Sequence, residues 1–305
     1  MKTALMFAGQ GAQYLGMGKS LYDTYPCVRE IFERAERILG YDLTKIMFED
    51  EQKLNDTLYT QTAMYVLYAS ILKILEEKNI RPGIALGLSL GEYGAYLYSH
   101  VFDFETGLKI IQKRAEVMNK AATKNPGLMS AILGIEADVL ETLIDQVDGY
   151  ATIANYNTYG QLVISGETQA IEKLNLMAKD AGAKRAIVLN TSGAFHSLLM
   201  KQARDDFREY LESVELNEPQ CRLLVNITGK DYQKDIKQVM ADQITNSVKF
   251  YQMIECLLED GVDTFIEIGP KTTLSGFVKK INRDVNILHI EDNQSLNDTI
   301  SFLEV

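Results

Sequence analysis

Residues 83–93 read Gly-Ile-Ala-Leu-Gly-Leu-Ser-Leu-Gly-Glu-Tyr, an apolar run that stops at a serine with a glycine two positions away on either side. The pattern predicts a buried strand, a sharp turn at Ser89 and then a helix. Gly87 and Gly91 suit such a turn because a Cβ at either position would collide with it. A serine placed there exposes its hydroxyl at the end of the strand, as in a nucleophile elbow. The motif alone leaves an ordinary glycine-bounded turn as the alternative.

The residues on both sides of this motif favour the elbow. Residues 84–88 suit a strand that is buried on both faces, and residues 90–98 continue without a helix breaker. A helix that begins beside Ser89 also directs backbone N–H groups toward negative charge developing on a substrate oxygen. We therefore treat Ser89 as a candidate nucleophile.

Composition places the chain among globular proteins. It has 305 residues, 46% of them hydrophobic and 24% charged, enough for one large domain and a smaller one. No apolar run has membrane-spanning length, and residues 1–8 read as a first strand instead of a signal peptide. We therefore expect a cytoplasmic protein. The net charge of -11 argues against nucleic acid as a partner.

The cysteines give no sign of a metal centre. Cys27, Cys221 and Cys256 are scattered, and they form neither a C-x-x-C pair nor an even-numbered framework. This pattern indicates reduced thiols and argues against a zinc site. We expect neither a metal nor a bound cofactor.

The order of predicted elements indicates an α/β fold in two parts. The first strand leads into the polar loop of residues 9–13, at the carboxyl end of the strand, where open α/β sheets bind ligands. Residues 125–196 follow the order strand, helix, strand, strand, helix, strand, with a turn at residues 157–160, which is typical of a ferredoxin-like unit. We predict that this compact unit interrupts a larger domain formed by residues 1–124 and 197–305.

The predicted helix over residues 103–122 carries an arginine on its apolar side. Projection at about 100° per residue gathers the lysines on one side and places Arg114 among the aliphatic residues of the other. A buried guanidinium cannot lose its proton and is costly without an anion. Arg114 is therefore a candidate anion-binding residue, with a structural salt bridge as the alternative.

A general base for Ser89 has to come from three histidines. His100 ends the helix of the elbow and points away from the turn, and His289 lies inside an apolar strand. His196 follows Gly193 just before a helix, where a loop residue can reach across a cleft. His196 is therefore the candidate base. No acidic residue stands out as its partner, and a backbone carbonyl could orient the imidazole instead.

Taken together, the motifs resemble those of the malonyl-CoA:acyl carrier protein transacylases, the acyltransferases of fatty acid and polyketide synthesis. The resemblance covers essentially the whole chain and implies a hydrolase-like large domain with a parallel sheet and a ferredoxin-like insertion. The motifs that carry it are residues 9–13, 87–93, 154–157, 194–197 and 265–270, together with Arg114.

Site residues follow from this resemblance position by position. It implies Ser89 as nucleophile and His196 as general base and acid, with the backbone carbonyl of Gln243 orienting the imidazole. It implies that the N–H groups of Gln10 and Leu90 form the oxyanion hole.

The resemblance also implies a substrate site. Arg114 would hold the free malonyl carboxylate through two parallel hydrogen bonds. Phe195 would leave little room for a branched acyl group. Asn155, Asn157 and Arg185 would line the coenzyme A entrance.

A few positions depart from the family pattern. Most members have histidine where Leu88 stands, which bears on the lifetime of the acyl-enzyme. Ser247 and Phe250 replace the usual proline and tryptophan, and Ala8 and Ala194 stand where bacterial members often have proline. These changes affect local rigidity more than chemistry.

The resemblance implies ping-pong transfer of malonyl from malonyl-CoA to the phosphopantetheine thiol of acyl carrier protein, through a malonyl-serine and without a metal. Alternatives are a trans-acting polyketide acyltransferase, an acyl hydrolase of the same fold and a non-enzymatic scaffold that binds carrier protein. The sequence does not decide the oligomeric state, and we expect a monomer. Lys279, Lys280 and Arg283 are our candidate docking cluster for the acidic carrier protein, with a solvated helix face as the alternative.

Overall fold

The computed structural model describes residues 1–233 and 235–304, which form two compact units. The first contains Met1–Ala115, Glu215–Val225 and the chain from Leu257 onward; the second contains Glu116–Val214 and Asn226–Cys256. The predicted division into 1–124 with 197–305 and 125–196 assigns fewer residues to the second part, and it stays a prediction.

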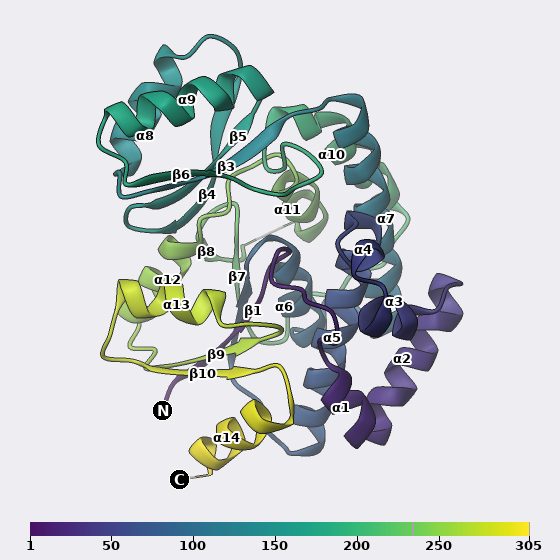
Figure 1. The fold of residues 1–305 in the computed structure, drawn as a ribbon. Helices are drawn as coiled ribbons and strands as arrows, with labels where there is room; N and C mark the ends of the chain where they lie inside the picture. Colours follow the sequence, from purple (N-terminus) through teal and green to yellow (C-terminus); the bar gives the residue numbers. More distant parts are fainter. Residues whose placement is uncertain (234, 305) are drawn as a thin grey trace. The chain divides into compact units, whose positions relative to one another are not determined.

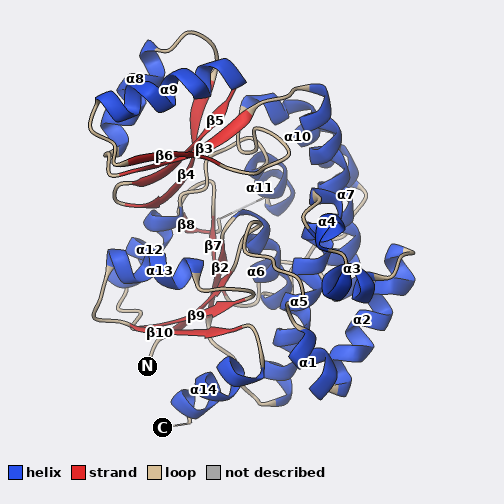
Figure 2. Cartoon of the chain, viewed as in Figure 1, coloured by secondary structure: helices blue, strands red, loops and turns tan. Residues whose placement is uncertain are grey.

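The first unit is built on a parallel sheet with strand order β10-β9-β1-β2-β7 (Figures 1 and 2). Phe7, the last residue of β1, is in register with Gly87 of β2 and with Ile268 of β9. The loops that follow these three strands therefore leave the sheet on the same side, at the carboxyl ends of the strands, where parallel sheets bind their ligands. The strands are β1 (Thr3–Phe7), β2 (Ile84–Gly87), β7 (Arg222–Val225), β9 (Thr264–Ile268) and β10 (Asn286–Ile290).

Apolar residues account for the core of this unit. Strands β2 and β9 are buried along their whole length, as expected for strands covered on both faces. Helix α5 (Thr57–Glu77) is buried on nearly all sides from its first residue to Leu75, and the Asp56 side chain caps its start by accepting from Leu58 N–H. Helix α6 (Glu92–Tyr98) packs on β1 and β2, and α13 (Thr273–Ile281) packs on β9 and β10.

Other helices of the first unit are α1 (Lys19–Thr24), α2 (Pro26–Leu39), α3 (Leu43–Glu49), α4 (Glu51–Leu54) and α14 (Asn293–Leu303). The long helix α7 (Phe104–Lys124) begins in the first unit and ends in the second. Within the described ranges, no helix is both long enough and apolar enough to cross a membrane.

The second unit contains an antiparallel sheet with strand order β4-β5-β3-β6 (Figure 2). The chain forms it in the order β3 (Leu128–Leu133), α8 (Ala137–Gln146), β4 (Ala151–Thr158), β5 (Gln161–Gly166), α9 (Thr168–Asp180) and β6 (Arg185–Val188). Ile132, Leu140, Ile164 and Leu174 lie in its core, which the two helices share with one face of the sheet. The unit also holds η2 (Leu198–Met200), α10 (Lys201–Glu212), β8 (Lys230–Asp231), α11 (Ile236–Gln243) and much of α12 (Phe250–Glu259).

One turn predicted in this unit is present but shorter than expected. Strand β4 continues through Asn157 to Thr158, so the turn is confined to Tyr159 and Gly160. Register shifts in the pairing of β4 with β5 allow the strand to continue where its polar sequence suggested a turn. Asn155 and Asn157 are therefore buried strand residues.

Candidate active site

Ser89 stands at the sharp turn between β2 and α6, as predicted. It adopts a φ of 53°, in the left-handed region, and begins the short 3₁₀ turn η1 (Ser89–Gly91). A Cβ at Gly87 would lie 2.1 Å from the carbonyl carbon of Gly91, and one at Gly91 would lie 2.0 Å from the carbonyl oxygen of Phe7. Only glycine fits at either position, so the turn holds the serine in a backbone conformation that is costly for a side chain to adopt.

Arg114 of α7 reaches this serine from within the core. Its Nη2 lies 3.4 Å from the Ser89 Oγ, and its Nη1 donates to the Oε1 of Gln61 over 2.8 Å. The guanidinium carbon lies 5.2 Å from the ring centroid of Tyr93, a cation–π distance. Only 1% of Arg114 is exposed, which confirms that it lies on the buried side of its helix. The result is a fixed cation beside the candidate nucleophile.

A buried carboxylate supports the charge of this arginine. Burial lowers the pKa of Arg114, while Tyr93 and Glu92 act against that shift. Glu92 is fully buried and accepts a hydrogen bond from the hydroxyl of Tyr96. The guanidinium lies against Ser89 and Gln61.

The loop after β1 lies at the same edge of the sheet. The Gln10 side chain donates from Nε2 to the Thr57 Oγ1 over 3.0 Å. The Ala8 N–H donates to the Ile268 carbonyl over 3.0 Å, which ties the start of the loop to the end of β9. A Cβ at Gly9 would lie 2.6 Å from the Leu88 Cδ2, so this loop packs directly against the residue before the serine. The loop and the elbow thus form one packed surface in the first unit.

His196 is held by backbone groups of the second unit. Its Nδ1 lies 2.9 Å from the Gln243 carbonyl oxygen and 3.1 Å from that of Asn246. A carbonyl can only accept, so Nδ1 carries the proton, and Nε2 is the nitrogen that can take another. The backbone of His196 has a φ of 56°, and its N–H donates to the Ile244 carbonyl. The expected contact with Gln243 is present, and Asn246 adds an acceptor that sequence reasoning missed.

Several predicted substrate residues also lie in the second unit. Phe195, next to His196, is buried, as are Asn155 and Asn157. Arg185 is exposed and starts the edge strand β6. Their proposed contacts with acyl chain or coenzyme A stay predictions. Ser247, which replaces the usual proline, donates its hydroxyl to the Ile153 carbonyl over 2.6 Å and so ties the segment after α11 to β4.

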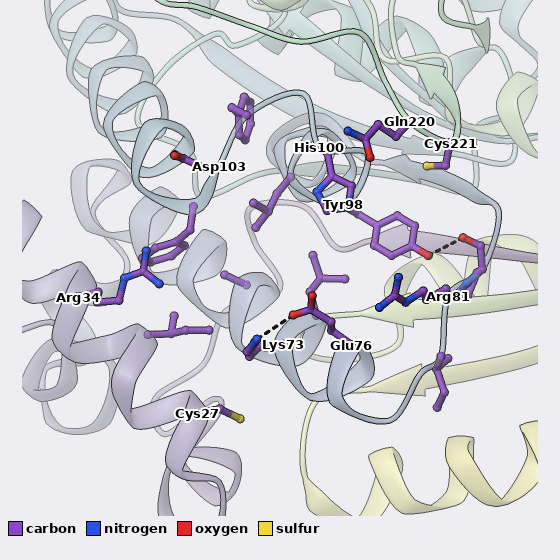
Figure 3. Close-up of a pocket in the computed structure, with 18 of the residues that line it drawn as sticks. Cys27, Arg34, Lys73, Glu76, Arg81, Tyr98, His100, Asp103, Gln220 and Cys221 are labelled. Carbon is purple, nitrogen blue, oxygen red and sulfur yellow. Dashed lines mark hydrogen bonds and ion pairs between the residues drawn. The ribbon is translucent and has the colours of Figure 1, made fainter.

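The first unit has a cavity of about 580 Å³ (Figure 3), and Ser89 is not among the residues that line it. Gly83 and Cys221 line it just before β2 and β7 begin, so it opens at the sheet edge opposite to Ser89. His100 lies on its wall, and Glu76 there pairs with Lys73 at 2.8 Å. His100 therefore faces away from the turn, as predicted. The other histidine set aside, His289, lies 3.6 Å from the Glu291 carboxylate.

Sequence reasoning missed the residues that surround Arg114 and the loop after β1. Gln61 and Thr57 belong to a helix whose sequence is mostly apolar. A polar amide among these apolar residues could have indicated a functional role for Gln61. Glu92 was another such signal, because it is a charged residue directly after a buried turn. The pairing of these residues with Arg114 or Gln10 joins positions far apart in the chain, which no local pattern reveals.

Comparison with known proteins identifies the family. The model of the acyl transferase domain matches residues 5–294. The chain belongs to the acyl transferase family. This acyl transferase is 36% identical to the malonyl CoA-acyl carrier protein transacylase of Bacillus subtilis, over 99% of this chain and 98% of the relative.

Solved structures of transacylases superpose on this acyl transferase along its whole length. A malonyl CoA-acyl carrier protein transacylase from Clostridium perfringens superposes with a TM-score of 0.96 at 39% identity, covering 100% of this chain and 98% of the other. A malonyl-transacylase solved with its type II PKS acyl-carrier protein gives a TM-score of 0.96 at 32% identity, covering 99% and 100%. The mixed α/β fold with its parallel sheet is thus shared with transacylase structures.

Proposed function

We propose that this acyl transferase moves a malonyl group from malonyl-CoA to the phosphopantetheine thiol of acyl carrier protein, for fatty acid synthesis. The observation that carries the proposal is the buried guanidinium of Arg114, 3.4 Å from the Ser89 Oγ and held by Gln61. An acyl group that ends in a carboxylate can pair with this cation while its thioester carbonyl lies at the serine. The names of the relatives at 32–39% identity support the same assignment.

In the first half-reaction, Ser89 attacks the thioester. His196 takes the hydroxyl proton on Nε2 while Oγ bonds to the carbonyl carbon, and the backbone N–H groups of Gln10 and Leu90 stabilise the oxyanion. Collapse of the tetrahedral intermediate breaks the C–S bond. The coenzyme A sulfur leaves with the proton from His196, and malonyl-Ser89 remains.

The second half-reaction reverses these steps with another thiol. The phosphopantetheine thiol gives its proton to His196 as its sulfur bonds to the ester carbonyl carbon. The ester C–O bond breaks, and Ser89 recovers the proton. The two backbone carbonyls at Nδ1 support this role, because they hold one tautomer of the imidazole without a third acidic residue. No bound cofactor or metal enters either step.

The arrangement also supports the proposed selectivity. Arg114 favours acyl groups that carry a carboxylate. From the family resemblance we propose that Phe195 limits branching of the acyl chain. We propose that Asn155, Asn157 and Arg185 contact coenzyme A. We further propose that residues 125–196 form a ferredoxin-like domain inserted into the sequence of a hydrolase-like one. The strand order of its sheet is second, third, first, fourth along the chain, which supports that assignment. We expect the enzyme to act in the cytoplasm as a monomer.

Intact-mass measurement tests the proposal. The protein mixed with malonyl-CoA should gain the mass of one malonyl group and lose it when holo carrier protein is added, with malonyl-carrier protein as the product. Ser89→Ala should gain nothing. Malonylation that persists in Ser89→Ala would contradict the proposed nucleophile, and loss of malonyl to water at the same rate without carrier protein would favour a hydrolase.

A further inference from the structure

Helix α5 holds the loop after β1 at two points. At its first residue, the Thr57 Oγ1 accepts a hydrogen bond from the Gln10 side chain over 3.0 Å. Three turns later, the Tyr68 hydroxyl donates to the Ala8 carbonyl. Tyr68 and its contact with Ala8 are fully buried, and Thr57 is 2% exposed, although the Gln10 side chain that it binds is partly exposed. The two hydrogen bonds lie on either side of the peptide that carries the Gln10 N–H.

The remaining contacts of the loop leave it little freedom. Ala8 uses its N–H on the Ile268 carbonyl and its C=O on Tyr68, so the plane of the backbone is set on both sides of this residue. Tyr68 also packs edge-on against Phe7, with ring centroids 5.6 Å apart. Burial raises the pKa of Tyr68 well above its ordinary value, so its hydroxyl stays a donor across the working pH range.

The same face of α5 also supports the acyl-binding arginine. Gln61, which accepts from Arg114 over 2.8 Å, stands four residues after Thr57 and seven before Tyr68. These spacings bring the three side chains to one side of a helix. One rigid element therefore contacts both the candidate oxyanion donor loop and the residue beside Ser89 that would bind the carboxylate.

We propose that Thr57 and Tyr68 are positioning residues that orient the backbone N–H of Gln10 for the oxyanion, which rests on the proposed function. Oxyanion stabilisation depends on donors about 2.7 to 3.1 Å from the position of the developing charge. A displacement of about 1 Å can cost on the order of 100-fold in rate. Removing either hydrogen bond, from Thr57 or from Tyr68, should therefore slow acylation without weakening substrate binding.

The test uses substitutions that remove single hydroxyl groups. Thr57→Val and Tyr68→Phe should each lower the rate of malonyl-Ser89 formation by about 10- to 100-fold, with the KM for malonyl-CoA changed less than about 3-fold. Thr57→Ser keeps the acceptor and should retain most of the rate. A fluorophosphonate that carries no carboxylate, which reacts with Ser89 and places a phosphoryl oxygen in the oxyanion position, should show the same loss. Because this probe has no carboxylate to bind Arg114, its reaction rate reports the effect of the loop independently of Arg114.

Two controls on the same helix match these variants. Thr62 is fully buried and its hydroxyl bonds to Tyr41 and to the Tyr59 carbonyl, and Tyr65 is fully buried and donates to the Phe104 carbonyl. These hydrogen bonds go to residues outside the loop. Thr62→Val and Tyr65→Phe should lose comparable thermal stability yet keep the phosphonylation rate.

The outcomes separate the two proposals. Equal loss of phosphonylation in test and control variants would overturn the positioning role, as would an unchanged rate in Thr57→Val and Tyr68→Phe. A wild-type protein that is not modified at Ser89 by either reagent would instead contradict the proposed function.

Discussion

Arg114 keeps a full positive charge at 1% exposure, because a guanidinium does not lose its proton in proteins. Gln61 and the ring of Tyr93 replace part of its hydration, and Glu92 favours its charged form. A carboxylate that enters beside Ser89 therefore meets a cation that is already dehydrated and fixed. Binding a carboxylate at Arg114 therefore costs less side-chain entropy than binding it at a mobile surface lysine.

His196→Ala should lower malonyl transfer by roughly two to four orders of magnitude, the usual contribution of a positioned general base. The substitution removes the acceptor for the serine proton and leaves the elbow of the first unit intact. Thermal melting should show a folded protein, and stopped-flow release of coenzyme A should show the slow step. Turnover within a few fold of wild type would mean that another group acts as the base.

Residues with a local signature were predictable, and residues defined by backbone geometry were not. The glycine spacing around Ser89 and the helical projection of Arg114 each constrain one side chain, and both appear as predicted. The carbonyl of Gln243 leaves no mark on its own side chain, so its contact with His196 came only from family resemblance. The carbonyl of Asn246 was missed for the same reason.

In the elbow, the turn at Gly91 approaches the ends of β1 and β2 more closely than a side chain would permit. Gly91→Ala would place a Cβ 2.0 Å from the Phe7 carbonyl oxygen, so either β1 or the turn has to move. We expect a loss of about 1 to 3 kcal/mol in the free energy of unfolding, as for other overpacked sites, together with loss of acylation.

Gly276→Ala is the matched control for this prediction. Gly276 lies in α13, and a Cβ there would have no neighbour within 4 Å. Alanine in place of a helical glycine should stabilise the protein by about 0.5 to 1 kcal/mol. Denaturant unfolding followed by circular dichroism measures both. A Gly91→Ala protein as stable as wild type would show that the elbow relaxes without cost.

Helix α5 shows what element-level prediction left out. Apolar residues at helical spacing are typical of such a helix, and the structure has it from Thr57 to Glu77. Its hydrogen bonds to Gln10, Ala8 and Arg114 join positions 47, 60 and 53 residues apart. Helical periodicity identifies which residues are buried, but tertiary packing alone decides what they contact.

The chain as a whole was predictable in class and in element order. Alternation of strands and helices indicated an α/β fold, and the parallel sheet order agrees with it. The turn predicted at residues 157–160 is present only at Tyr159 and Gly160, because β4, whose pairing with β5 is irregular, continues to Thr158. Such register shifts depend on the partner strand, so no single segment reveals them.

Charge distribution over the molecule leads to a prediction about carrier protein. Lys279 and Lys280 are exposed in the last turn of α13, and Arg283 is exposed just beyond it. Helix α13 connects the parallel strands β9 and β10, so its last turn lies near the amino ends of the strands. Ser89 follows the carboxyl end of β2, so this turn cannot touch the acyl group. Lys279→Glu with Lys280→Glu should raise the KM for carrier protein several-fold, more at low salt.

Self-malonylation of that double variant should match wild type, because no acyl contact changes. Lys78→Glu, on the C-cap of α5, is a control of similar exposure and charge outside the cluster. Carrier kinetics that match wild type at every salt concentration would reject the cluster as a docking surface.

Acyl-enzyme formation from malonyl-CoA and from acetyl-CoA, followed by mass spectrometry on wild type, Arg114→Ala and Arg114→Lys, tests the central claim. Arg114→Ala should reduce malonylation by about 2 to 5 kcal/mol of transition-state stabilisation, the range for losing one partner of a desolvated charge pair. Acetylation should fall far less or rise, because no buried cation then opposes an uncharged chain. Arg114→Lys should restore only part of the malonyl reaction, since a point charge cannot make two parallel contacts. Equal losses for both substrates would show that Arg114 is structural and would contradict the assignment of malonyl selectivity to it.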